Sequence, residues 1–169
     1  ASAQDKNYRL TLDSSICDGD TLYVVITVEG LHEQAVENLK NNQVIADCYR
    51  AAWGREMPEN LMEQGQGDIS VFQFQMEAGN HMSSFGFEEL PAPSETSRSW
   101  QLQLTLTGLE HPQTEPIGLR LGFMEESCVL QIPVDQMPQV VRVSIARELS
   151  VDWNGGEEVF VDHVEIGPT

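Results

Sequence analysis

Apolar and polar residues alternate along most of this chain, and this period of two limits it to folds built mainly from β-strands. The clearest example begins at position 100, where every second residue is large and apolar: Trp100, Leu102, Leu104 and Leu106. The residues between them are Gln or Thr. Because successive side chains of a strand point to opposite faces, this segment predicts a strand with one buried side and one water-facing side.

The same alternation recurs at regular intervals, separated by residues that favour turns. Asp18-Gly19-Asp20 and Asn154-Gly155-Gly156 are clear turn signals, because Asp, Asn and Gly tolerate the backbone angles of tight turns. The alternating segments amount to about nine short strands. We therefore predict a single β-rich domain over residues 1–169, with the fold of an antiparallel β-sandwich or flattened barrel.

Residues 32–54 depart from this pattern and predict a short α-helical insert. Their apolar residues recur at three and four positions, which is the period of a helix: Ala35, Val36, Leu39, Ile45, Ala46, Tyr49, Ala52 and Trp53. Tyr49, Arg50 and Trp53 belong to residue types that anchor protein interfaces, and they are our candidate partner-binding residues. The simpler interpretation is that the apolar stripe of the insert covers the sheet.

The chain is strongly acidic, with 27 Asp and Glu residues against 9 Lys and Arg and a formal net charge of −18. Nucleic-acid affinity is built from Lys and Arg on phosphates, so this charge argues against a DNA or RNA partner. It disfavours anionic lipid surfaces too, and the longest apolar run, Leu22 to Ile26, is too short to be a transmembrane segment. A charge-driven partner would be a basic protein or a divalent metal ion, although acidity also serves solubility alone.

Two features favour an exported protein of the periplasm or the extracellular space. Ala1-Ser2-Ala3 has the A-x-A form found where a secretory signal is cleaved, and a cloning remnant has the same form. Cys17, Cys48 and Cys128 form no C-x-x-C pair, so they favour one disulfide and one remaining thiol. Cys17–Cys48 is the first choice for the disulfide, and Cys48–Cys128 is the second.

Motifs of the common catalytic sites are missing from the sequence. It contains no G-x-S-x-G element, no phosphate-binding loop and no dinucleotide fingerprint. His32-Glu33 begins like the zinc motif H-E-x-x-H, but position 36 is Val, so the second zinc ligand is absent. We therefore expect a protein that is not an enzyme, with a hydrolase using paired carboxylates as the least favoured alternative.

Oxygen-bearing side chains cluster at two predicted turns and are candidate calcium ligands. They are Asp13, Asp18 and Asp20 around one turn and Asp152, Asn154, Glu157 and Glu158 around the other. Carboxylate and amide oxygens are the ligands that calcium takes. Neither cluster completes an EF-hand, and the conformational preferences of turn residues account for both clusters without a metal.

A candidate copper site lies around the predicted turn at Gly79-Asn80. Met76 precedes this turn, and His81 and Met82 follow it. Thioether and imidazole groups suit Cu(I) in an exported protein. The simpler interpretation is that Met76 continues the apolar face that begins at Phe72, because methionine commonly fills gaps in a core.

These features predict a non-catalytic exported module that binds or supports other molecules through its surface, with a basic protein as the favoured partner. The alternative is a periplasmic or extracellular metal-binding protein that holds calcium or copper. The two hypotheses differ in a measurable property, because a bound metal raises the melting temperature of the folded state by mass action.

Overall fold

The computed structural model describes residues 1–18, 20–63, 69–78, 80–107, 115–134, 141–153 and 157–166. At positions 18, 63, 107, 141–153 and 157–166 it describes the backbone alone. Within these ranges the chain forms ten strands, all paired antiparallel, and three short helices. The prediction of a mainly β fold with antiparallel strands is thereby confirmed.

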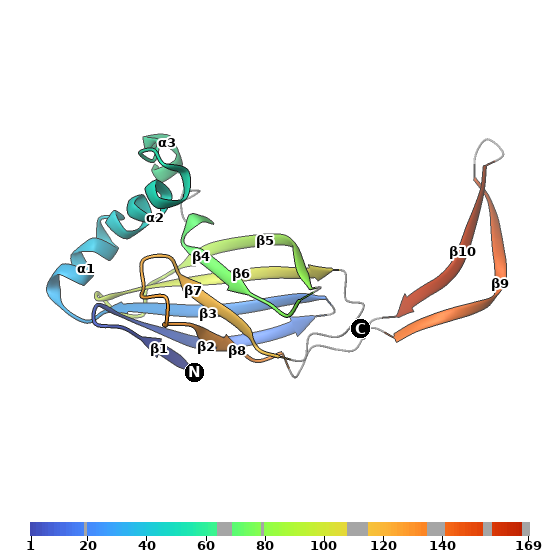
Figure 1. Cartoon of the computed structure of the whole chain (residues 1–169), viewed down its shortest axis with the longest axis horizontal. Helices are drawn as coiled ribbons and strands as arrows, with labels where there is room; N and C mark the ends of the chain where they lie inside the picture. Colours follow the sequence, from blue (N-terminus) through green and yellow to red (C-terminus); the bar gives the residue numbers. More distant parts are fainter. Residues whose placement is uncertain are drawn as a thin grey trace.

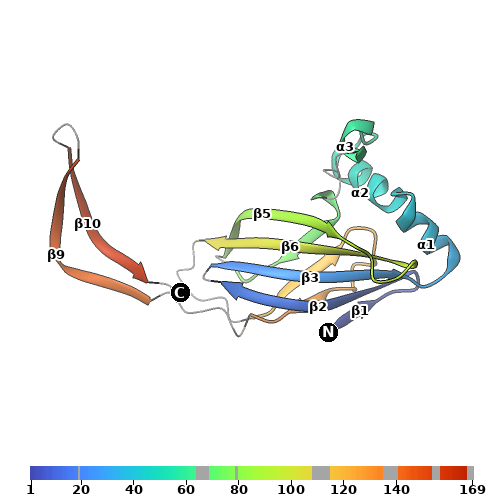
Figure 2. The same cartoon turned by 180° about the vertical axis from the view of Figure 1, so that it is seen from behind.

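Five strands form the largest sheet, in the order β1-β2-β3-β6-β5 (Figures 1 and 2). Their bounds are Ser2–Gln4 (β1), Tyr8–Asp18 (β2), Thr21–Gly30 (β3), Ser97–Thr107 (β6) and His81–Leu90 (β5). The predicted alternation is confirmed in β6, where the four apolar residues from Trp100 to Leu106 are buried. The short β1 escaped prediction because it carries one apolar residue, Ala3.

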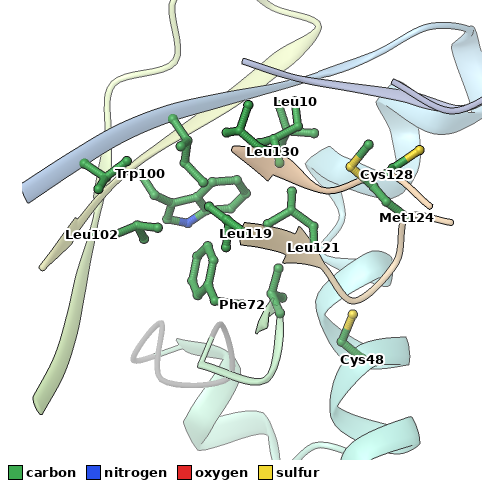
Figure 3. Close-up of a cluster of buried hydrophobic side chains, with 14 of the residues drawn as sticks. Leu10, Cys48, Phe72, Trp100, Leu102, Leu119, Leu121, Met124, Cys128 and Leu130 are labelled. Atoms are coloured by element: carbon green, nitrogen blue, oxygen red, sulfur yellow. The ribbon is translucent and has the colours of Figure 1, made fainter. Parts of the chain in front are cut away.

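A second sheet contains three short strands in the order β4-β7-β8. Their bounds are Phe72–Gln75 (β4), Ile117–Leu121 (β7) and Leu130–Ile132 (β8). Both sheets contribute to one hydrophobic core, in which Trp100 and Leu102 lie beside Phe72 and Leu119 (Figure 3). The rings of Phe72 and Trp100 meet edge to face with centroids 5.7 Å apart. Burial of one large apolar side chain is worth about 1.5–3 kcal/mol, so this core supplies much of the stability.

The last two strands, β9 (Val141–Trp153) and β10 (Glu157–Ile166), pair with each other as a separate two-stranded sheet. Their register shifts between Val161 and His163, which marks a bulge or irregularity in the ladder. Strands thus flank the turn that Asn154-Gly155-Gly156 predicts. The turn predicted at 154–156 lies outside the described residues.

The helical insert lies between β3 and β4 and consists of α1 (Glu33–Lys40), α2 (Gln43–Trp53) and α3 (Glu59–Glu63) (Figure 1). The prediction of helix for residues 32–54 is thereby confirmed. Asn42 separates α1 from α2 with a φ of 61°, and Gly54 follows α2 with a φ of 67°. Among the described residues, no helix has the length and apolarity that crossing a bilayer demands.

The insert packs closely on the end of β3 because Gly30 has no side chain. A Cβ built on Gly30 would lie 2.7 Å from the backbone nitrogen of Val36 and 2.9 Å from its Cα. These are backbone atoms of α1, which cannot move aside as a flexible side chain can. Glycine at this position therefore lets α1 approach the sheet and bury Ala35 and Leu39 in the core.

Candidate functional site

Trp53 closes α2 and leaves 62% of its surface exposed, whereas Tyr49, one turn earlier, is 5% exposed and belongs to the core. The two rings are tilted by 39°, with centroids 6.2 Å apart. Tyr49 therefore supports the indole from the protein side and cannot itself offer a broad contact to a partner. Of the three predicted partner-binding residues, Trp53 and Arg50 are exposed and Tyr49 is not.

Charged groups at the end of α2 pair with one another. The guanidinium of Arg50 lies 3.5 Å from a carboxylate oxygen of Asp47 and 2.8 Å from one of Glu56. The hydrogen bond that Arg50 donates to Glu56, together with the negative charge of Glu56, raises the pKa of Arg50 above its ordinary value. Arg55 donates a hydrogen bond of 3.4 Å to the hydroxyl of Tyr49. The surface at this end of α2 therefore presents an exposed indole among charges that are already balanced.

A groove with a volume of about 770 Å³ runs along α1, and this volume is within the range of ligand sites. Its α1 wall carries Glu33, Val36, Glu37 and Lys40, which share one face of the helix. Thr96 also lines the groove, and its carbonyl accepts a hydrogen bond of 2.9 Å from the backbone nitrogen of Gly30. The sequence marks Glu33 and Glu37 as an exposed helix face, but no local pattern reveals that Thr96 lines the same groove.

His32 lines the groove and is the N-cap residue of α1. Its Nδ1 accepts a hydrogen bond of 3.3 Å from the backbone nitrogen of Ala35, as an N-cap side chain does. With Nδ1 as the acceptor, Nε2 carries the proton and donates to the amide oxygen of Asn7 at 3.0 Å. Both ring nitrogens are therefore engaged, and His32 holds the start of α1 rather than serving as a base for a ligand.

Arg98 on β6 connects the insert to the large sheet. Its Nη1 donates to the side-chain oxygen of Asn42 at 2.7 Å and to the carbonyl of Leu39 at 3.3 Å. Its other two nitrogens, Nε and Nη2, donate to the two carboxylate oxygens of Glu89 at 2.8 and 2.9 Å. The guanidinium also lies over the ring of Trp100, 5.1 Å from the centroid. One side chain thus fixes the α1–α2 junction against β5 and β6.

The first predicted calcium cluster is described only in part. The carboxylate of Asp13 accepts a hydrogen bond of 2.6 Å from the hydroxyl of Thr27, and that of Asp20 accepts one of 3.2 Å from Thr21. The side chain of Asp18 lies outside the described residues. Throughout the described ranges, no three His, Cys, Asp or Glu side chains form a group that could hold a metal ion. Calcium at this turn stays a prediction.

The second predicted calcium cluster falls largely outside the described residues. Asn154 is not described, and only the backbone is described for Asp152, Glu157 and Glu158. Asp152 lies directly opposite Glu158 in the ladder of β9 and β10. The backbone thus brings these two positions together, and calcium there also stays a prediction.

The candidate copper ligands lie at the ends of β4 and β5. Met76 and Met82 are half-buried and pack against the hydrophobic core, whereas His81 is exposed. In the sheet Met82 faces Leu106, and His81 faces Thr107. The burial of the two methionines favours the core-filling interpretation, and copper binding stays a prediction.

No disulfide joins Cys17, Cys48 and Cys128, all of which the structure describes. The pairing expected first, Cys17–Cys48, is therefore absent, and so is Cys48–Cys128. Cys17 lies near the turn between β2 and β3, opposite Leu22. Cys48 lies on α2 in the core region of Figure 3, where its sulfur would be 3.1 Å from a Cβ built on Gly122. The tertiary structure therefore does not form the pair that the order of the chain suggested.

Cys48 and Cys128 are both buried, and their surroundings indicate that they serve the structure rather than a reaction. Burial, together with the nearby charge of Asp47, raises the pKa of the Cys48 thiol from 9.0 to about 11. A thiol held in its neutral form is a poor nucleophile. The thiol of Cys128 donates to the backbone carbonyl of Gln4 at 3.1 Å, and so helps to join β1 to the segment before β8.

These observations leave two surface features of the insert as candidate contact sites: the exposed indole at the end of α2 and the groove along α1. The indole belongs to α2, whereas the groove is formed by α1 together with Gly30 of β3 and Thr96. Comparisons of the chain with protein-family models, with curated proteins and with solved structures found no match.

Proposed function

We propose that this domain is a non-catalytic exported binding module that contacts a basic protein through the exposed end of α2. The observation that carries the proposal is the 62% exposure of Trp53 beside a buried Tyr49. Tryptophan is enriched among the residues that dominate binding energy in protein interfaces. An indole that contacts a buried ring and leaves most of its surface in solvent is suited to fill a pocket of a partner.

The charge of the chain supports a basic partner. At a formal net charge of −18, the domain attracts a cationic protein over several ångströms and repels an anionic one. Long-range attraction of this kind speeds association and weakens as salt is added.

The architecture supports a scaffold role. We infer that the five-stranded and three-stranded sheets form a β-sandwich around their shared core, with the insert as an added contact element. Sandwiches commonly serve as rigid supports for binding surfaces in exported proteins, although this analogy concerns the fold and not the site. Export to the periplasm or the extracellular space belongs to the same proposal.

Three variants test the proposal in a capture experiment with extract and medium of the source cells. The bait is the wild-type domain, the Trp53→Ala variant or the Ile16→Ala variant. Ile16 is 64% exposed on β2 and provides a control of matched exposure outside the insert. Captured proteins are identified by mass spectrometry, purified and titrated at low and high salt, and the purified domain is analysed for bound metal.

We expect one basic partner whose affinity falls about tenfold or more with Trp53→Ala, as for an interface anchor, and stays unchanged with Ile16→Ala. Its affinity should fall with added salt. Equal capture by all three baits would contradict the role of Trp53. Stoichiometric calcium or copper without a partner would favour the alternative, an exported metal-binding protein.

A further inference from the structure

We propose that the groove along α1 receives a Lys or Arg side chain of the protein partner. This inference rests on the proposed binding of a basic protein, but it does not depend on Trp53. It identifies a second contact on the insert and the chemistry that this contact recognises.

The shape and floor of the groove suit a long side chain with an apolar stem. Leu31 and Val36 line the groove and are half-buried, so each leaves apolar surface accessible. The aliphatic stems of Lys and Arg cover apolar surface while their charged ends stay in water. A volume of about 770 Å³ leaves room for such a side chain together with its own backbone segment.

The charges of the groove favour a cation at one end. Glu33 and Glu37 are exposed, lie four residues apart on α1 and both line the groove. Within the described part of the chain, neither carboxylate takes part in an ion pair. Lys40 lies beyond Glu37 along α1 and lines the groove as well. The cation is therefore expected near the two glutamates, with a carbonyl or carboxylate of the partner near Lys40.

The test uses a fluorescein-labelled heptapeptide, Gly-Leu-Arg-Gly-Leu-Arg-Gly, and a matched peptide with Gln in place of both Arg residues. Binding is measured by fluorescence anisotropy at low and high salt. The variant Glu33→Gln/Glu37→Gln removes both carboxylates from the groove. The control Glu88→Gln/Glu126→Gln changes the net charge equally at two exposed residues that do not line the groove. Thermal melting of each variant verifies that it is folded.

We expect the groove variant to weaken binding of the Arg peptide about fivefold, and the control to change it less than about twofold. The Gln peptide should bind at least about fivefold more weakly than the Arg peptide. In NMR titrations, the amide signals of Gly30 to Asn41 should shift most.

Equal weakening by both variants would overturn the proposal, because net charge alone would then explain the binding. Shifts confined to amides outside the groove would overturn it as well. Either result leaves the capture of a partner through Trp53 intact, whereas loss of that capture contradicts the proposed function itself. The two proposals can therefore fail separately.

Discussion

Replacing Arg98 by alanine should lower the free energy of unfolding by about 3 kcal/mol, well above the effect of an ordinary surface charge. The side chain is 12% exposed, and its bonds to Asn42 and Leu39 lie at the junction of α1 and α2. Hydrogen bonds made by a charged group contribute about 1.5–3 kcal/mol. Glu89 is 51% exposed, so we assign its ion pair only about 0.5 kcal/mol. Stacking over Trp100 adds about 0.5–1 kcal/mol.

The assay is urea unfolding at pH 7, followed by far-UV circular dichroism and tryptophan fluorescence. A loss of stability shifts the midpoint at an unchanged slope. Arg98→Lys should lose more than half as much unfolding free energy as Arg98→Ala. The reason is that a single ammonium group cannot bind Glu89 and Asn42 at the same time as the planar guanidinium does. The expected fall in melting temperature for Arg98→Ala is about 6–12 °C for a chain of this length.

Double-mutant cycles identify which contact matters. Asn42→Gly removes the amide acceptor and still permits the φ of 61°, so it isolates the side-chain bond from backbone strain. We expect its coupling with Arg98→Ala to exceed about 1 kcal/mol, and that of Glu89→Gln to stay below about 0.5 kcal/mol. A loss under about 1 kcal/mol for Arg98→Ala, or full recovery with Lys, would refute the reasoning.

Two further predictions concern packing and titration. Gly30→Ala should destabilise the domain by about 1–3 kcal/mol because the new methyl meets the backbone of Val36, whereas Gly86→Ala, with open space around it, should cost far less in the same unfolding assay. Equal losses would contradict the close approach of α1. Because the pKa of Cys48 is raised from 9.0 to about 11, the folded state keeps a proton that the unfolded chain loses. The contribution of Cys48 to stability should therefore be complete well below pH 9 and fall by about 2 kcal/mol as the pH rises to 11, with a shallower fall in Cys48→Ala. Identical pH dependence in the two proteins would contradict this assignment.

Local patterns determined the secondary structure of this protein. The alternation from Trp100 to Leu106 specifies a strand with one buried face, because a strand has a period of two whatever it pairs with. The period of three and four in residues 32–54 specifies helix for the same reason. Both were predicted from the residues alone and are present, since each depends only on neighbours along the chain.

Long-range packing decided the features that bear on function. The pairing of β3 with β6 joins Ile26 to Trp100 across more than seventy residues, and no local pattern encodes that choice. The same packing forms no disulfide between Cys17 and Cys48, although the order of the chain suggested one. It also buried Tyr49 and exposed Trp53, two aromatic residues four positions apart with the same helical phase.

The groove along α1 also results from long-range packing. The sequence places Glu33 and Glu37 on one exposed face of α1, but the groove is also lined by Thr96, which follows two more helices and two more strands along the chain. Helix period and turn chemistry act over a few residues, so they fixed which side chains share a face. Which faces meet depends on how the whole chain buries its apolar surface, and only the tertiary structure supplies that.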